Sequence, residues 1–133
     1  MNEDLLLEQK ADLMLELFEY GSQVEENMLV SWLIHNIKEK KGHVIVGELI
    51  EKTGYSHRYA DHVFKTNMGC SIKRFAGIER MQASIKYLLE EREDEIYSEL
   101  GYYDQAHFIK DFKKFTTVTP NSFKKDSGKL AMM

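Results

Sequence analysis

The chain has 133 residues, which is the length of one domain, or of one domain with an arm. No apolar run approaches the ~20 residues needed to span a bilayer, and the acidic start MNEDLLLEQK is unlike a signal peptide, so we expect neither a membrane protein nor a secreted one. The single cysteine, Cys70, excludes an internal disulfide and fits a reducing cytoplasm.

The net charge of −4 is unevenly distributed. Residues 1–26 carry one lysine and eight acidic residues, a net of −7, whereas residues 27–125 carry sixteen basic and thirteen acidic residues, a net of +3. Residues 126–133 carry one of each sign. The chain is therefore expected to consist of an acidic arm and a mildly basic domain, and the placement of the basic residues matters more than their sum.

The arm is predicted to contain an amphipathic helix over Asp4–Tyr20, ended by Gly21 and Ser22. Its apolar stripe at helical spacing consists of Leu7, Ala11, Met14 and Phe18. Three roles fit this wide apolar face: packing on the rest of the chain, pairing with its copy in a homodimer, or binding another protein.

A second helix is expected over Asn27–Lys41, and a short one over Gly47–Thr53. The inward residues of the second helix are predicted to be Met28, Trp32, Leu33 and Ile37. The run from Gly54 to Gly69, GYSHRYADHVFKTNMG, then reads as a glycine that ends one helix, a cap at Ser56 and a new helix. The apolar stripe of that helix is formed by Tyr59, Val63 and Phe64.

A long helix is expected from Ser71 to about Glu90, spanning about 28 Å at 1.5 Å per residue. Its apolar face is predicted to consist of Ile78, Met81, Ile85, Leu88 and Leu89. A short helix over Asp94–Leu100 comes next, and Arg80 is expected to bridge helices inside the protein.

The stretch GYYDQAHFIKDFKKFTTVTPNSFKK, Gly101 to Lys125, repeats the earlier pattern more strongly. Gly101 is expected to end one helix and Asp104 to cap the next. That helix buries a predicted stripe of Phe108, Phe112 and Phe115. Thr119 and Pro120 are the start signal of a last helix that ends near Asp126, and residues 127–133 are expected to fray.

Gly54 and Gly101, which open the two similar runs, are 47 residues apart. The only candidate strand, Val44–Val46, has three residues between helices and is better explained as a turn. We therefore predict an all-α fold in which a long helix joins two related helix-turn-helix units, with an amphipathic helix at the N-terminus. Two fixed recognition helices suit a partner that repeats, and duplex DNA repeats every ~34 Å.

Residues 27–125 resemble the DNA-binding domain of the AraC/XylS family of bacterial transcriptional regulators. The specific part of the match is Gly101, Tyr102, Asp104, Gln105, Phe108, Phe112, Lys113, Lys114, Thr119, Pro120, Phe123 and Lys124. A looser match upstream comprises Leu49, Gly54, Tyr55, Ser56, Phe64, Lys65, Gly69, Phe75, Arg80 and Leu88. The resemblance implies seven helices in two lobes, about 27–70 and 91–125, joined by a linker helix over about 71–90. It also implies that one recognition helix per lobe enters the major groove.

The same resemblance implies which side chains meet DNA. Those facing the groove are His57, Arg58, Asp61 and His62 in lobe one, and Gln105, Ala106, Ile109 and Lys110 in lobe two. Arg58 and Lys110 suit guanine and Gln105 suits adenine. The predicted set is completed by Lys65, Lys73, Arg74, Lys113 and Lys114, of which the last four suit phosphates.

No pattern in the sequence supports catalysis, a cofactor or a metal. His57 and Asp61 share a helix face, but His62 points elsewhere and no cysteine completes a metal site. Phosphate loops and the His-Glu-x-x-His pattern are absent. We therefore expect a regulator in the cytoplasm, at the nucleoid, that binds double-stranded DNA together with RNA polymerase or another regulator. The alternative is an AraC-like interaction module whose DNA binding is weak or lost and which acts through dimerisation.

Overall fold

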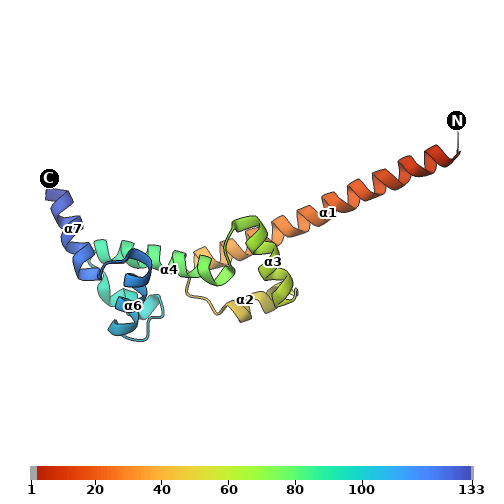
Figure 1. Ribbon diagram of the computed structural model, residues 1–133. Coiled ribbons are helices and arrows are strands. Elements are labelled where there is room, and N and C mark those ends of the chain that lie inside the picture. The colour runs from red at the N-terminus through yellow and green to blue at the C-terminus, as the bar shows by residue number, and fades with distance from the viewer. Residues whose placement is uncertain (1–2, 133) are drawn as a thin grey trace.

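The computed structural model describes residues 3–132, with side chains described for residues 6–127, and within that range every regular element is a helix. The elements are α1 (Glu3–Glu39), α2 (Val46–Thr53), α3 (His57–Met68), α4 (Ile72–Leu89), α5 (Glu93–Glu99), α6 (Gln105–Thr116) and α7 (Pro120–Met132). The molecule is elongated, with the free half of α1 at one end and α7 at the other (Figure 1). The prediction of an all-α fold is confirmed.

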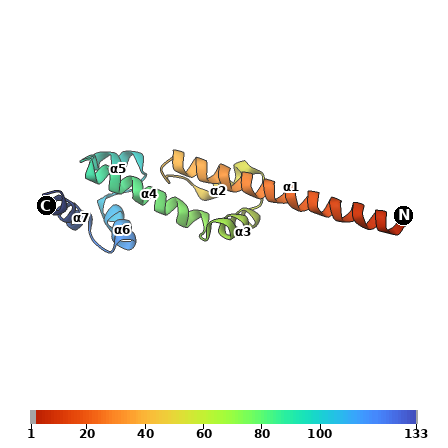
Figure 2. The same ribbon diagram turned by 90° about the horizontal axis from the view of Figure 1, so that it is seen from above.

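Two separate hydrophobic cores divide the helices into two lobes. The first core joins α1, α2, α3 and the start of α4, and its fully buried members include Leu33, Ile37, Ile50, Phe64 and Ile72. The second joins the end of α4 to α5 and α6, and its most buried members include Tyr87, Leu88, Ile96, Leu100 and Phe112. Figure 2 shows α4 passing from one group of helices to the other. The predicted pair of lobes on a long linker helix is therefore confirmed.

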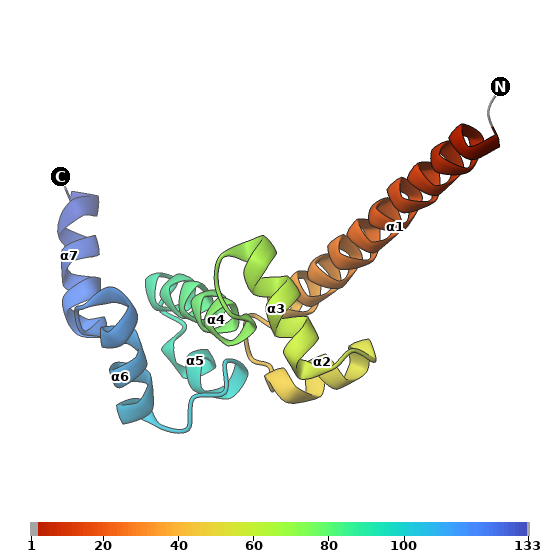
Figure 3. The same cartoon turned by 45° about the vertical axis from the view of Figure 1, so that its right-hand side comes forward.

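The helix α1 is continuous over Glu3–Glu39, so the predicted break at Gly21 and Ser22 is wrong. A glycine inside a helix costs only about 1 kcal/mol relative to alanine, and no proline follows it here. Gly21 also lies outside the positive-φ region in which glycines end helices. The arm is thus an extension of the first helix of lobe one, and it projects away from the lobes (Figure 3).

The two halves of α1 turn their apolar faces in different directions. In the second half, Leu33 and Ile37 are fully buried in lobe one. At 3.6 residues per turn, the line of these residues continues into the first half as Glu8, Asp12 and Glu19, with Leu15 as the one large apolar residue among them. The apolar residues of the arm therefore point elsewhere, and large ones such as Leu7, Met14, Phe18 and Tyr20 are 64–72% exposed. In this structure the arm does not pack on the rest of the chain.

Several side chains lie further out than the sequence predicted. Met28 is 67% exposed and Trp32 is 37% exposed, although both were expected to face inward. At about 100° per residue, Met28 falls nearly opposite Leu33 and Ile37 on α1 and Trp32 more than about 90° from both, so the buried face is narrower than the predicted stripe. Leu89, at the end of α4, is likewise 53% exposed.

The bounds of α2, α4 and α5 lie within a residue or two of the predicted ones, but α7 continues to Met132 instead of ending near Asp126. The predicted end of the last helix near Asp126 is therefore wrong, whereas fraying of residues 127–133 stays a prediction, and Met133 lies outside the described residues. The helix continues through Gly128, as α1 continues through Gly21, because one glycine inside a helix costs only about 1 kcal/mol. None of the described helices is long and apolar enough to cross a membrane.

The continuous helix can be tested at Gly21, where an added Cβ atom would meet nothing within 4 Å. Gly21→Ala should stabilise the helix by about 1 kcal/mol and slow amide hydrogen exchange in the residues around it. Gly54→Ala is the matched control, because φ of +77° at Gly54 makes the same change destabilising. Exchange around residue 21 that does not respond to the substitution would contradict a continuous α1.

Candidate nucleic-acid interface

The start of α3 is fixed by a glycine that ends the preceding helix and by a side-chain cap, both of which the sequence predicts. Gly54, at φ +77°, ends α2, and Ser56 then caps α3 by accepting a hydrogen bond from the Tyr59 N–H at 3.1 Å. One face of α3 is buried through Ala60, Val63 and Phe64. Tyr59 was predicted to join that stripe but is 37% exposed. The opposite face of α3 is free to meet a partner.

The helix α6 is built in the same way. Gly101, at φ +74°, ends the preceding turn, and Oδ1 of Asp104 accepts a hydrogen bond from the His107 N–H at 2.7 Å. Phe108 and Phe112 are buried as predicted. Phe115 is 37% exposed, so the predicted stripe is buried only over its first two members. The ring of Phe115 lies against α4, where a Cβ added at position 77 would come within 3.2 Å of it.

All thirteen side chains predicted to contact DNA are exposed. On α3 these are His57, Arg58, Asp61, His62 and Lys65; on the first turn of α4 they are Lys73 and Arg74; on α6 they are Gln105, Ala106, Ile109, Lys110, Lys113 and Lys114. The structure thus gathers seven of them around lobe one and six on lobe two. Their contacts with DNA stay predictions, since no nucleic acid is present.

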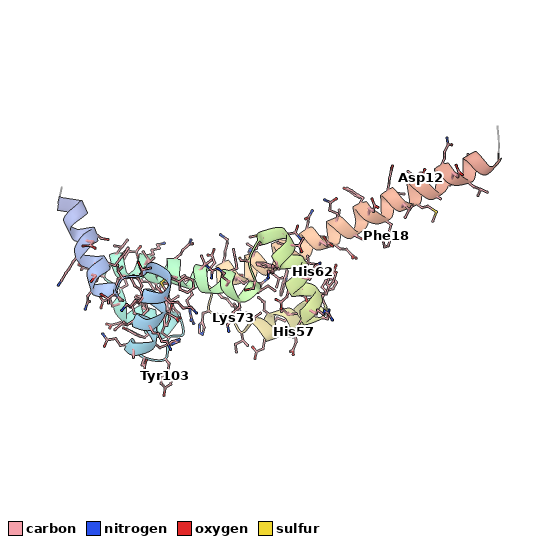
Figure 4. All side chains as sticks on the ribbon, viewed as in Figure 1. Asp12, Phe18, His57, His62, Lys73 and Tyr103 are labelled. Carbon is pink, nitrogen blue, oxygen red and sulfur yellow. The ribbon has the colours of Figure 1, made fainter. Side chains whose placement is uncertain are left out.

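Three exposed tyrosines on or beside α3 and α6 were not predicted from the sequence to contact DNA. Tyr103, directly before the cap of α6, is 92% exposed, and it lies on the same side of the molecule as His57 of lobe one (Figure 4). Tyr55 and Tyr59 pack together at the start of α3 with ring centroids 5.1 Å apart. The pair of tyrosines in GYYD could have indicated this from the sequence. Two neighbouring residues cannot both face the core, and here Tyr102 is buried and leaves Tyr103 exposed.

Polar contacts fix α6 on the linker helix. The Arg80 guanidinium of α4 donates to Asp111 of α6 at 3.0 Å and lies 4.3 Å from the ring centroid of the buried Tyr102. The expectation that Arg80 bridges helices is confirmed. Nδ1 of His107 accepts from the Tyr103 N–H at 3.2 Å, so this histidine turns towards its own lobe. Burial raises the pKa of Tyr102 above its usual range, which keeps its hydroxyl neutral.

The acidic run before and within α5 is partly neutralised by neighbouring cations. Arg92 pairs with Glu90 at 2.9 Å and also with Glu95, and these hydrogen bonds raise its pKa. Lys124 of α7 donates to Glu93, which raises the lysine pKa. Negative side chains in the first turn of α5 also favour its helix dipole. These ion pairs and the dipole account for the run as a structural feature of lobe two.

Among the residues whose side chains are described, no three histidine, cysteine or acidic side chains come together as a metal site. The shallow hollow of about 430 Å³ beside α3 is lined by Ser56, Arg58, Tyr59 and His62. A hollow with an arginine and a tyrosine at its wall offers a hydrogen-bonding and a stacking group, which suits the edge or the backbone of a nucleic acid.

The fold and its two exposed, capped helices define a helix-turn-helix DNA-binding protein. A family model described as a helix-turn-helix domain matches residues 49–126, which is more than half of the chain and includes both α3 and α6. The chain belongs to this family, the AraC/XylS type of transcriptional regulator.

Two relatives are consistent with this assignment. The chain is 26% identical to the probable transcription factor PqrA of Proteus vulgaris over 102 residues, which cover 75% of this chain and 83% of that protein. Its fold is similar to that of the C-terminal domain of AraT, a response regulator from Geobacillus stearothermophilus, with a TM-score of 0.67 and 24% identity. That superposition covers 74% of this chain and 84% of the AraT domain.

The cap of α6 can be tested by two substitutions at one position. Asp104→Ala removes the acceptor for the His107 N–H and should cost about 1 kcal/mol of stability in chemical denaturation. Asp104→Asn keeps an acceptor of equal capping strength and should cost little. Equal stability of the alanine and asparagine variants would contradict a capping role for Asp104.

Proposed function

We propose that this DNA-binding transcriptional regulator reads duplex DNA with both lobes, placing α3 and α6 in successive segments of one major groove. The observation that carries the proposal is the same architecture in each lobe: a left-handed glycine, a side-chain cap and a 12-residue helix with one buried and one exposed face. The 18 residues of α4 span about 27 Å, which is close to the ~34 Å repeat of duplex DNA.

The exposed side chains fall into two groups by the chemistry they offer. Arg58 and Lys110 can donate to guanine and Gln105 can make paired hydrogen bonds with adenine, so these three are proposed to read sequence. Lys73 and Arg74 lie in the first turn of α4, and Lys113 and Lys114 in the last turn of α6. These four suit phosphates, which position the protein without specifying a base.

The competing function is an interaction module with weak or lost DNA binding, and one observation favours it. Asp61 lies exposed among the proposed contacts on α3, where a carboxylate accepts only from cytosine and repels phosphate. Asp61→Asn separates the two functions, because tighter DNA binding is expected if α3 enters a groove. If the chain acts only through proteins, the substitution leaves DNA affinity unchanged.

The direct test is selection from a random-sequence duplex pool at two salt concentrations. The proposal predicts enrichment of a motif with two half-sites about one helical turn apart and affinity that falls steeply with salt. A pool that stays random even at low salt would overturn DNA reading and favour the interaction module.

Two single substitutions should then act differently on the selected site. Arg58→Ala should cost about 1–3 kcal/mol and relax selectivity at one base position. Lys113→Ala should weaken binding to all sequences alike and flatten the salt dependence by about one unit. Lys40→Ala, an exposed lysine at the end of α1, is the control and should change neither quantity. A uniform loss on every sequence for Arg58→Ala would refute its assignment to base reading.

We also propose that the exposed arm of α1 pairs with its copy in a homodimer; RNA polymerase or another regulator stays a predicted further partner. The arm leaves several large apolar side chains exposed, and a cluster of this kind is typical of an interaction surface. The main stripe of this surface has residues at alternating intervals of four and three along the helix. This is the spacing of the seam of a coiled coil. That stripe consists of Leu7, Ala11, Met14, Phe18, Gly21, Glu25, Met28 and Trp32.

The side-chain sizes along this stripe favour antiparallel pairing. Antiparallel helices that cross near residue 20 place Phe18 opposite the partner's Gly21 and Ala11 opposite the partner's Met28, so that at these positions a large residue meets a small one. In the same register Met14 lies opposite the partner's Glu25, which separates the two glutamates. Parallel pairing would instead set Glu25 beside the partner's Glu25, and like charges in a seam are unfavourable. Apart from Glu25, the acidic residues of each arm whose side chains are described lie on a different face of the helix and stay in water.

Light scattering tests the dimer. The full chain is expected at twice its mass of 15.6 kDa, and Phe18→Glu should return it to the monomer mass. Gln23→Glu is the matched control, because it adds the same charge on the acidic face and should leave the dimer intact. A full chain that is monomeric at micromolar concentration would contradict the proposal.

A further inference from the structure

The joint between the two lobes lies within α4, which is continuous from Ile72 to Leu89. Ala76 is the last residue of α4 in the first core and Met81 is the first in the second core, so residues 77–80 lie between the cores. Gly77 stands within this interval, and a glycine weakens the interior of a helix and lets it bend. Core packing within each lobe therefore does not by itself fix the angle between the lobes.

The loop between α1 and α2 lies directly on this joint. Gly42, at φ +77°, donates its N–H to the carbonyl of Ile37 at 2.8 Å. A Cβ atom added at Gly42 would stand 2.2 Å from the carbonyl oxygen of Ala76 and 2.5 Å from the backbone nitrogen of Arg80. The loop backbone is thus in close contact with the α4 backbone at both ends of the joint, and any larger residue would push the two apart.

On one side of Gly42, the chain reaches the second lobe through Lys41. Its ammonium donates to the hydroxyl of Tyr87, lies 3.5 Å from Glu99 of α5 and stands 4.8 Å from the Tyr87 ring centroid. The Tyr87 hydroxyl in turn donates to Glu99 at 2.5 Å. The hydrogen bond to Tyr87 raises the pKa of Lys41 and lowers the pKa of Glu99, so both stay charged near neutral pH.

On the other side of Gly42, His43 reaches the turn of the second helix-turn-helix. A Cβ atom added at Gly101 would stand 2.2 Å from Nε2 of His43 and 2.7 Å from its Cε1. The imidazole ring therefore lies on the face of the glycine that starts the turn before α6. A residue of the loop between α1 and α2 thus touches the turn that precedes α6 in lobe two.

We propose that these contacts form a clasp that fixes the angle between the lobes and thereby determines which spacing of two DNA half-sites the protein accepts. The clasp consists of Lys41, Gly42 and His43 with their lobe-two partners Tyr87, Glu99 and Gly101. The effect on half-site spacing rests on the proposed two-lobe reading of DNA, whereas the effect on lobe angle does not.

The length of α4 makes this angle matter. The middle of the joint lies about 10 Å from the start of α4 and about 16 Å from its end. A bend of about 15° therefore displaces these ends by about 2.5 and 4 Å, which is close to one base-pair step of about 3.4 Å. A protein with a fixed angle should therefore accept one spacing. A protein with a loose joint should accept neighbouring spacings, each with lower affinity, because the effective concentration of the second lobe at its half-site falls.

The lobe angle can be measured on the protein alone by pulsed electron paramagnetic resonance. Cys70→Ser removes the native thiol, and spin labels at the exposed positions Thr66 and Asn121 report the distance between α3 and α7. The clasp predicts one narrow distance distribution for this labelled protein.

The clasp variant is Lys41→Met with His43→Ala, and its matched control is Lys40→Met with His35→Ala, which changes the same residue types at exposed positions. The clasp variant should broaden or shift the distance distribution, and the control should leave it unchanged. Should the clasp variant unfold, Glu99→Gln removes the charge that Lys41 meets and keeps the side-chain shape. An unchanged narrow distribution in the folded variant would overturn the clasp.

Selection from the random duplex pool provides the second readout. The parent protein should favour one spacing by about tenfold over spacings one base pair longer or shorter, and the clasp variant should enrich the same half-sites with that preference largely lost. Enrichment of one fixed spacing by the clasp variant would overturn the proposed control of spacing. Failure of both proteins to enrich any motif would instead overturn DNA reading, while the distance measurement would still decide whether the clasp exists.

Discussion

Burial of one face of each recognition helix is the constraint on which the interface depends. Phe64 on α3 and Phe112 on α6 are fully buried, and each fixes the rotation of its helix about its own axis. Rotation then decides which side chains face outward, because positions three or four residues apart share a face. Arg58 and Gln105 are exposed for this reason. The caps at Ser56 and Asp104 fix the residue at which each of the two helices begins.

Charge is separated along the molecule in a way that suits this interface. The acidic residues of the arm belong to a helix that projects away from both lobes (Figure 1), so they lie far from most of the basic side chains on α4 and α6. In α5, Glu95 is engaged by Arg92 and Glu93 by Lys124. Salt screens charges beyond about 8–10 Å, so the net charge of −4 says little about the field at α6. The base of the arm does reach α3, because burial and then the charges of Glu26 and Glu25 raise the pKa of Tyr59.

Features set by a few neighbouring residues could be predicted from the sequence, and features set by distant ones could not. The glycine stops at Gly54 and Gly101 and the cap at Asp104 follow from local geometry, and so do the buried faces of α3 and α6. The continuity of α1 through Gly21 could not be predicted, because the penalty of one glycine is smaller than what the whole helix gains. The contact of His43 with Gly101 joins residues far apart in the chain, and no periodicity marks it.

The central claim is that α3 and α6 bind one face of duplex DNA as a rigid pair. The most direct test is to insert five base pairs, about half a helical turn, between the two half-sites obtained by selection. The account predicts that affinity falls to that of a duplex with one half-site, because the second recognition helix then meets the opposite face of the DNA. Equal affinity for the original and the lengthened duplex would contradict the account.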